Sequence, residues 1–254
     1  MLKKLIAVTL TLLVLTTSVI AYAENEWYSA AAEKFATLGA ISETEDITAS
    51  LTRAQFVGII NASLGYMKNG QAMVEFDNTY NFNDLFYDSP HQKSFLIARS
   101  MGILQGDQNN NANPESLITR SEVSVIISRI IGLDIKRANI VSNFNDDAAL
   151  PDWARPYIVA LTNEGYLKGD PANNFRPSAP ITGAETVVLL DRVLGDIIST
   201  DRMLDNMKFD GNVTIIGGNV SITNTTISGN LLITQAVKDI VMDNVTIGKD
   251  LIQK

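Results

Sequence analysis

The chain has 254 residues, 46% of them hydrophobic, and a formal net charge of −8 at neutral pH. This acidic balance argues against nucleic-acid binding, because contacts to phosphates need an excess of lysine and arginine. The sequence contains no cysteine, which excludes disulfides and thiolate metal sites, so packed apolar side chains must stabilise the fold.

The N-terminus has the pattern of a secretory signal peptide. Lys3 and Lys4 precede an apolar run over residues 5–20, and Ala21-Tyr22-Ala23 has the small-x-small pattern of a signal peptidase site. The run is short for a bilayer span of about 20 residues, so secretion is favoured over an uncleaved membrane anchor. We expect residues 1–23 to be removed and the mature protein to have no further association with the membrane.

A five-residue segment that occurs three times, here called the capping motif, organises most of the remaining chain. Each copy places Thr three residues before Gln or Glu and directly before an apolar run. The Thr hydroxyl and the Gln or Glu side chain can then satisfy free backbone N–H groups at a helix start, so each copy is expected to open a helix. The copies are Leu51-Thr52-Arg53-Ala54-Gln55, Ile118-Thr119-Arg120-Ser121-Glu122 and Ile181-Thr182-Gly183-Ala184-Glu185.

A second helix is expected before each capping motif. It ends at an aligned glycine, Gly39, Gly102 or Gly165, that can adopt the left-handed conformation found at helix C-termini. One repeat is therefore helix, loop, helix, and apolar residues at matching offsets give each second helix one buried face. The interval from the glycine to the motif is 12 residues in the first copy (39 to 51) but 16 in the others (102 to 118, 165 to 181), so the first loop is shortened.

The order of these features resembles the S-layer homology (SLH) motif. The resemblance also includes Phe-Asn-Asp at residues 82–84 and 144–146, Trp153 on a first helix, and the Phe175-Arg176-Pro177 loop. The third copy matches over most of its length, the second well, and the first only in its helices and its capping motif. Three SLH motifs form one SLH domain, so the resemblance implies a pseudo-threefold domain whose helix-loop-helix repeats surround a central three-helix bundle.

Beyond Asp201 the pattern changes to short alternating runs of Val, Ile and Thr separated by Gly and Asn. Such runs predict turns followed by short strands, and two of them are offset by 20 residues (224 to 244). We expect a β-solenoid-like segment with asparagines at the turns; a small antiparallel sheet is the alternative. The runs are Gly211-Asn212-Val213-Thr214-Ile215, Gly218-Asn219-Val220-Ser221-Ile222, Gly229-Asn230-Leu231-Leu232-Ile233, Asn224-Thr225-Thr226-Ile227 and Asn244-Val245-Thr246-Ile247.

The chain is therefore expected to be mainly α, with the SLH domain followed by the short β-solenoid-like segment. The expected parts are the signal peptide (1–23), SLH motifs 1, 2 and 3, called repeats 1, 2 and 3 below (24–66, 82–133 and 144–195), two linkers (67–81 and 134–143) and the β-solenoid-like segment (201–254).

Two arginines of the capping motifs are the leading candidates for ligand binding. Arg53 and Arg120 follow the capping Thr, where backbone donors and the helix dipole already favour an anion. A guanidinium there can add two parallel hydrogen bonds to a carboxylate. The resemblance implies a groove for a pyruvate ketal on a secondary cell-wall polysaccharide, with these arginines on the ketal carboxylate; the alternative is a capping box with an exposed arginine. The third copy has Gly183 instead, so its pocket is expected to be weak or silent.

The other expected binding residues come from the same motifs and from two aligned tryptophans. Gln55 replaces the usual Glu, which preserves the capping geometry but removes a negative charge close to Arg53. Glu122 and Glu185 are first of all capping residues, with a contribution to the groove as the second interpretation. Trp27 and Trp153 lie at the same offset before the aligned glycine, where an aromatic ring can stack on a sugar or serve a core or interface role. The polysaccharide-binding set is completed by Thr52 and Thr119.

No catalytic group, metal site or cofactor is expected. The Asp107-x-Asn109-x-Asn111 spacing resembles the start of a calcium loop, but Ala112 replaces its glycine and Ile118 its bidentate Glu, so a polar turn is predicted. His91 has no companion nucleophile and is expected to be a surface residue. Glycosidic chemistry needs two facing carboxylates, and the C-terminal aspartates lie at turns without such a pairing: Asp210, Asp239, Asp243 and Asp250.

These observations favour a secreted, non-enzymatic protein that anchors noncovalently to the bacterial cell wall through an anionic, pyruvylated polysaccharide. The alternative is a wall-anchored carbohydrate-active enzyme with an incomplete β-helix domain, which fold-level analogy alone supports. Only two or three coils fit into the C-terminal segment, fewer than a solenoid core usually needs. That segment is expected to pack on the helical domain, to self-associate, or to begin a longer array.

Overall fold

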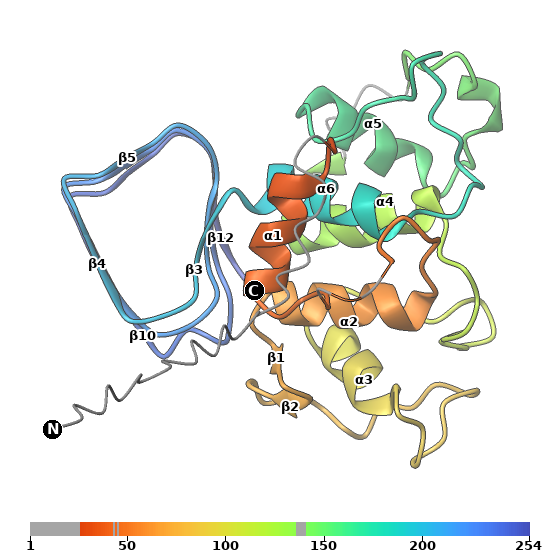
Figure 1. Cartoon of the computed structure of the whole chain (residues 1–254), viewed down its shortest axis with the longest axis horizontal. Coiled ribbons are helices and arrows are strands. Elements are labelled where there is room, and N and C mark those ends of the chain that lie inside the picture. The colour runs from red at the N-terminus through yellow and green to blue at the C-terminus, as the bar shows by residue number, and fades with distance from the viewer. Residues whose placement is uncertain (1–25, 43, 45, 136–140) are drawn as a thin grey trace, which may run out of the picture.

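The structure is a computed structural model that describes residues 26–42, 44, 46–135 and 141–254. The expected signal peptide and its processing site lie outside the described residues. A helical domain and a β-solenoid lie side by side (Figure 1). Within the described ranges, no helix has both the length and the apolar character needed to cross a membrane.

The helical domain contains two helices from each repeat and a small hairpin. A short 3-10 helix, η2 (Asp147–Ala149), precedes α5. The hairpin strands are β1 (Met67–Lys68) and β2 (Gln71–Ala72), which pair antiparallel. The helices are α1 (Ser29–Thr37), α2 (Arg53–Ser63), α3 (Gln92–Ser100), α4 (Arg120–Ile130), α5 (Arg155–Asn163) and α6 (Gly183–Leu194).

The three capping motifs begin helices in the same way. The hydroxyls of Thr52, Thr119 and Thr182 accept a hydrogen bond from the backbone N–H three residues later, and the Gln or Glu at that position accepts one from the Thr backbone. These reciprocal bonds satisfy donors that a helix start leaves free. The helix starts predicted from the sequence are therefore confirmed.

Backbone hydrogen bonds join the three motifs into a closed ring. Leu51 N donates to Ile181 O at 2.9 Å, Ile181 N to Ile118 O at 3.1 Å, and Ile118 N to Leu51 O at 3.0 Å. Each repeat thus makes the same contact with the next, and the third makes it with the first. This cyclic relation is the pseudo-threefold arrangement.

The first helix of each repeat packs on the capping-motif helix of the preceding repeat. The pairs are α3 on α2, α5 on α4, and α1 on α6, which closes the ring (Figure 1). The capping-motif helices bury most of their residues, whereas the first helices bury only one face. Buried side chains from all six helices form one apolar core, so each repeat depends on its neighbours to cover its apolar surface.

The C-terminal part is a β-solenoid of parallel strands. Its three sheets have the orders β4-β7-β10, β5-β8-β11 and β3-β6-β9-β12, and every pairing within them is parallel. This topology confirms the solenoid and excludes the antiparallel alternative. The strands are β3 (Asp196–Ile198), β4 (Arg202–Asp205), β5 (Lys208–Phe209), β6 (Val213–Ile215), β7 (Asn219–Thr223), β8 (Thr226–Ile227), β9 (Leu231–Ile233), β10 (Asp239–Asp243), β11 (Thr246–Ile247) and β12 (Leu251–Gln253).

Asparagines occupy one corner of the solenoid in each successive coil. Asn206, Asn224 and Asn244 have φ values of 54°, 48° and 51°, a left-handed conformation that asparagine tolerates better than most residues. Asn244 Nδ2 donates to Asn224 Oδ1 at 2.8 Å, so adjacent corners are also hydrogen-bonded. The predicted role of asparagines at the turns is confirmed at this corner.

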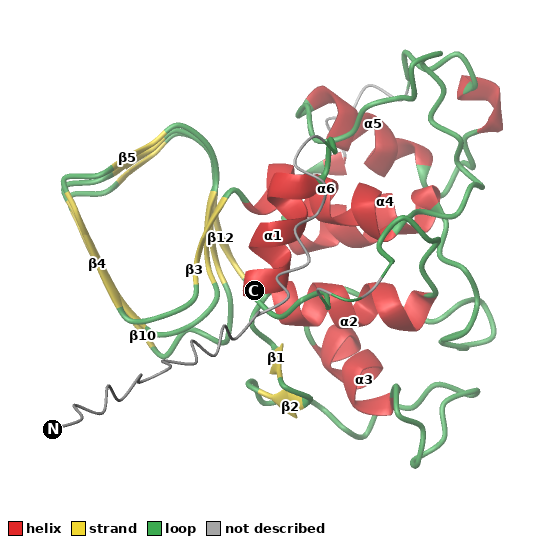
Figure 2. Ribbon diagram, viewed as in Figure 1, coloured by secondary structure: helices red, strands yellow, loops and turns green. Residues whose placement is uncertain are grey.

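The expectation of a mainly α chain is wrong. The structure is 29% helical and 19% strand, and it carries the β-solenoid (Figure 2). The helices are only 9 to 12 residues long, because each repeat divides its residues between two helices and a polar loop. The strands are shorter still, at 2 to 5 residues, so each gives a weak signal in the sequence although together they form the whole β-solenoid.

The sheet β3-β6-β9-β12 packs against the helical domain. Leu232 of β9 belongs to the helical core, and Ile197 and Ile252 pack against it. At the connection after α6, Gly195 has a φ of 62°, and a Cβ there would lie 2.0 Å from Asn212 O, so only glycine fits. Of the arrangements expected for the C-terminal segment, the structure has the one in which it packs on the helical domain.

Candidate functional site

The capping-motif arginines reach across the junctions between consecutive repeats. Arg53 Nε donates to Ala112 O and its Nη1 to Glu122 Oε1, both at 2.8 Å. Arg120 makes the equivalent bonds to Phe175 O at 2.7 Å and Glu185 Oε1 at 2.9 Å. The two side chains are only 9% and 10% exposed, so neither arginine is exposed beside its capping box.

The acidic residue of each Phe-Asn-Asp segment positions the loop that receives the arginine. The Asp84 carboxylate accepts from Ala112 N at 2.6 Å and Asn113 N at 2.7 Å. The Asp146 carboxylate accepts from the N–H groups of Phe175 and Arg176 at 2.8 and 2.7 Å. The carbonyls that accept from Arg53 and Arg120 are therefore fixed by these aspartates.

Each arginine keeps unused hydrogen-bond donors. A guanidinium has five N–H groups, and the contacts above use one on Nε and one on Nη1. Nη2 of Arg53 and of Arg120 has no partner among the residues that the structure describes. Burial lowers the pKa of Arg120, opposed mainly by the nearby Glu185 carboxylate, but arginine starts so far above neutrality that it stays charged.

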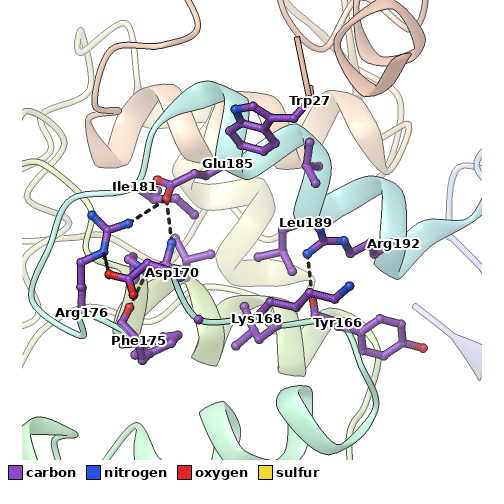
Figure 3. Close-up of a pocket in the computed structure, with 15 residues that line it drawn as sticks. Trp27, Tyr166, Lys168, Asp170, Phe175, Arg176, Ile181, Glu185, Leu189 and Arg192 are labelled. Atoms are coloured by element: carbon purple, nitrogen blue, oxygen red, sulfur yellow. Dashed lines mark hydrogen bonds and ion pairs between the residues drawn. The ribbon is translucent and has the colours of Figure 1, made fainter. Parts of the chain in front are cut away.

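Arg120 lines a groove of about 160 Å³ between repeats 2 and 3, here called the Arg120 groove (Figure 3). Trp27, from the start of repeat 1, also lines it and is 62% exposed. The charged lining residues are four cations and two carboxylates: Arg120, Lys168, Arg176, Arg192, Asp170 and Glu185.

The charged groups of the Arg120 groove form two clusters (Figure 3). In one, Arg176 Nη2 lies 3.4 Å from Glu185 Oε1 and its Nε lies 3.5 Å from Asp170 Oδ2. In the other, Arg192 donates to the Tyr166 carbonyl at 3.4 Å, beside Lys168. The Lys168 ammonium has no polar partner within the described part of the chain and is exposed to solvent. The groove therefore has an excess of positive charge.

A second groove of about 470 Å³, the Arg53 groove, lies between repeats 1 and 2. Trp153 from repeat 3 is its aromatic lining residue and is 55% exposed. Its charged lining residues are two cations and two carboxylates: Arg53, Arg129, Asp107 and Glu122. Each groove thus takes its arginine from one repeat, its loop from the next and its tryptophan from the third.

The third junction lacks these features. A Cβ on Gly183 would lie 2.8 Å from Ile47 O, and Ile47 is only 4% exposed, so the short loop of repeat 1 occupies the space of an arginine. Pro90, twelve residues before Gly102, stands where the other junctions have tryptophan. By the cyclic relation, Gln55 stands opposite Gly183, so this junction has lost both the arginine and its carboxylate. The charge that Gln55 removes was expected to be missing close to Arg53, but the carboxylate that pairs with Arg53 comes from Glu122, and Gln55 belongs to this other junction.

The sequence-predicted residues fall into two groups. Arg53, Glu122 and Trp153 line one groove, and Arg120 and Trp27 line the other. Thr52, Thr119 and Gln55 do not line either groove and serve the helix starts. Sequence reasoning missed the loop and helix cations Lys168, Arg176, Arg192 and Arg129, although a constant offset of 63 residues between repeats 2 and 3 (129 to 192) aligns the last two.

The suspected calcium loop is a polar turn, as predicted. Asp107 Oδ1 accepts from the backbone N–H groups of Asn109 and Asn111 at 2.8 and 2.9 Å, and Oδ2 accepts from Asn113 Nδ2 at 3.0 Å. These bonds, led by that of the Asn111 N–H, lower the pKa of Asp107. Across the described ranges there is no cluster of three or more His, Cys, Asp or Glu that could hold a metal ion.

Comparison with known proteins finds similarity to one segment of the helical part. Residues 143–187 match the S-layer homology domain. The surface-layer 125 kDa protein of Lysinibacillus sphaericus is 26% identical over 133 residues, which is 51% of this chain and 11% of that protein. The cellulosome-anchoring protein of Acetivibrio thermocellus is 28% identical over 151 residues, 57% of this chain and 32% of that protein.

An amylopullulanase of Thermoanaerobacterium thermosulfurigenes is 30% identical over 146 residues, which is 56% of this chain but only 7% of that enzyme. The chain therefore spans less than a third of the length of these relatives. The matched S-layer homology segment contains the loop, the Glu185 carboxylate and two of the four cations of the Arg120 groove, Lys168 and Arg176.

Proposed function

We propose that this protein, which contains an S-layer homology domain, anchors noncovalently to the bacterial cell wall by binding an anionic secondary cell-wall polysaccharide in the Arg120 groove. The excess of cations over carboxylates in that groove carries the proposal. A secreted chain bound in this way would lie at the cell surface.

A pyruvate ketal on a sugar fits the chemistry of the groove. Its carboxylate can take charge-assisted hydrogen bonds from the free Arg120 Nη2 and from Lys168, which are stronger than bonds between neutral groups. The ketal also carries a methyl group, and the groove has apolar walls that include Val188 and Leu189. The exposed ring of Trp27 offers a face on which the sugar can stack. The groove thus matches the charged, the apolar and the ring parts of one sugar unit.

The relatives support an anchoring role. Two are named as a surface-layer protein and a cellulosome-anchoring protein, and the segment shared with this chain is a small part of each. Others are named as enzymes, an amylopullulanase and an exoglucanase, and this chain spans 7% and 12% of their length. We therefore assign the chain a binding function and no catalytic one.

Sedimentation with purified cell walls tests the proposal. The protein is expected to sediment with walls that retain the polysaccharide and to stay in the supernatant when the polysaccharide has been extracted. Lys168→Glu should strongly reduce sedimentation, because it places a carboxylate where the ligand's carboxylate would bind. Lys208→Glu makes the same charge change on the solenoid, where the Lys208 side chain is 73% exposed, and should have no effect.

Equal sedimentation by both variants, or binding to extracted walls, would show that the interaction is nonspecific. Release of reducing sugar from the walls during the incubation would instead favour the enzyme alternative. The two variants make the same charge change at different places. A difference in their sedimentation therefore shows that the contact with the wall lies at the Arg120 groove and not on the solenoid.

A further inference from the structure

The Arg120 and Arg53 grooves have the same framework but different lining residues. An offset of 63 residues relates the loop and helix positions that repeats 2 and 3 contribute, as between Asp107 and Asp170. Both grooves have an arginine from a capping motif, a carboxylate that pairs with it, and an exposed tryptophan. Two of the related positions differ in charge: Lys168 corresponds to Gln105, and Arg176 corresponds to Asn113.

These two differences remove the positive excess from the Arg53 groove. Its two cations and two carboxylates balance, and each has a partner inside the protein. Arg53 pairs with Glu122, and Arg129 donates to the Gln105 side-chain oxygen at 3.1 Å. Asp107 accepts from its own turn. A ligand carboxylate entering this groove would lose its hydration in a site of zero net charge, whereas the Arg120 groove offers it the additional cations Lys168 and Arg176.

The backbone at the second position has a conformation that arginine seldom adopts. Arg176 has a φ of 56° and Asn113 a φ of 49°, both in the left-handed region. Asparagine is favoured in that region, whereas a long side chain such as arginine is not. The loop in repeat 3 therefore carries an unfavourable residue in a conformation that asparagine adopts more easily. Such a placement points to a function for the side chain.

The Arg53 groove instead has the features of a site for an uncharged sugar. It is the larger of the two, at about 470 Å³, and Leu104, Val125 and Ile126 line it. Trp153 presents an exposed ring, and the side-chain amides of Gln105 and Gln108 supply donors and acceptors for hydroxyl groups. Aromatic stacking with a few well-placed polar groups is the usual basis of recognition for a small neutral ligand.

We propose that the two grooves differ in ligand class: the Arg120 groove takes a carboxylate-bearing sugar, with Lys168 and Arg176 as its specificity-determining residues, and the Arg53 groove takes an uncharged sugar. This inference rests on the proposed function, because it assumes that the grooves bind polysaccharide. Two different contacts with one polymer would raise the overall affinity, since the second contact forms at a high effective concentration.

The two tryptophans make each groove separately observable. The whole sequence contains two tryptophans, one in each groove, so the two indole N–H signals in a ¹⁵N NMR spectrum report on the grooves one by one. The probes are a methyl hexoside that carries a 4,6-linked pyruvate ketal and the same hexoside without the ketal. With the wild-type protein, the ketal probe should shift the Trp27 signal and the uncharged probe the Trp153 signal.

Exchange of the two positions between grooves should exchange their specificity. Lys168→Gln with Arg176→Asn should weaken binding of the ketal probe at Trp27 by about tenfold or more, as expected for the loss of charge-assisted hydrogen bonds. Gln105→Lys with Asn113→Arg should give the Trp153 signal a response to the ketal probe. Each loop already tolerates the introduced residue at the matching place in the other repeat, so both variants should fold; unchanged far-ultraviolet circular dichroism checks this.

The results separate failure of this inference from failure of the proposed function. Similar affinity of the ketal probe for both grooves in the wild type would overturn the inference and leave the proposed function intact. The same follows if the exchange variants keep wild-type specificity, or if the uncharged probe leaves Trp153 unchanged. No response of either signal to either probe would overturn both.

Discussion

Replacement of Glu122 by glutamine should destabilise the protein, whereas the reverse change at the matching position 55 should not. The Glu122 carboxylate uses both oxygens: Oε1 accepts from Arg53, and Oε2 accepts from Thr119 N and Oγ1 at 2.8 and 2.7 Å. A side-chain amide has only one oxygen. After Glu122→Gln, its NH₂ group must face either the guanidinium or the Thr119 N–H, and one donor loses its acceptor.

The expected magnitude follows from the contact that is lost. A hydrogen bond to a charged group contributes about 1.5–3 kcal/mol, and the two side chains are 9% and 32% exposed, so about 2 kcal/mol is expected. For a protein of this size that corresponds to a fall in melting temperature of roughly 4–8 °C. At position 55, Gly183 supplies no guanidinium and Gln55 Oε1 already accepts from Thr52 N. Gln55→Glu should therefore change stability by less than about 0.5 kcal/mol.

Urea unfolding of a double-mutant cycle measures this. With Arg53→Met in the background, the amide at position 122 needs to accept only from Thr119, so Glu122→Gln should cost about 1–2 kcal/mol less than in the wild type. An equal cost in both backgrounds would refute the reasoning, because the penalty would then not arise from the contact between repeats.

Three further predictions concern the repeats and their attachment to the solenoid. A fragment of residues 144–195 should show no cooperative thermal transition by circular dichroism, because α5 packs on α4 and α6 on α1, which the fragment lacks; a cooperative transition would contradict the cyclic packing. Tyr166→Phe should lower stability by about 1–2 kcal/mol in urea unfolding, since the hydroxyl accepts from Asn212 and Asn230 Nδ2 at 2.9 and 3.2 Å. Tyr87→Phe, at a side chain that is 93% exposed, is the matched control, and an equal effect of both changes would argue against the contact. Hydrogen bonds from Thr223 and Asn224 lower the pKa of Asp205, so its stabilisation is complete above the unfolded pKa of about 4 and is lost as pH falls through the lower folded value. The urea midpoint should therefore drop as the pH falls below about 4, and by less in Asp205→Asn; an equal drop would refute this role.

The local parts of the fold could be predicted from the sequence because their causes are local. A Thr with a Gln or Glu three residues later satisfies donors within one helix turn, and all three helix starts were predicted correctly. Turn asparagines with regular spacing likewise identified the solenoid. The chain was nevertheless expected to be mainly α, since two-residue strands such as β5 contain too little alternation to be recognised one at a time.

The composition of the site could be predicted only in part because it depends on contacts between distant residues. Arg120 and Glu185 are 65 residues apart, and nothing local in the sequence indicates that they form a pair. The same holds for Gln55 and Gly183. Each looks like a separate exception to the capping-motif pattern, and only the closed ring of three repeats places them opposite each other. Lys168 and Arg176 lie in a loop whose sequence predicts only a turn, although comparison of that loop with its counterpart in repeat 2 would have shown the difference in charge.

A crystal structure of the protein with the ketal-bearing hexoside tests the central claim most directly. We predict that the ketal carboxylate will lie within about 3 Å of Arg120 Nη2 and of the Lys168 or Arg176 side chain, with the sugar ring against Trp27. A ligand at the Gly183 junction or on the solenoid, with the Arg120 groove empty, would contradict the account.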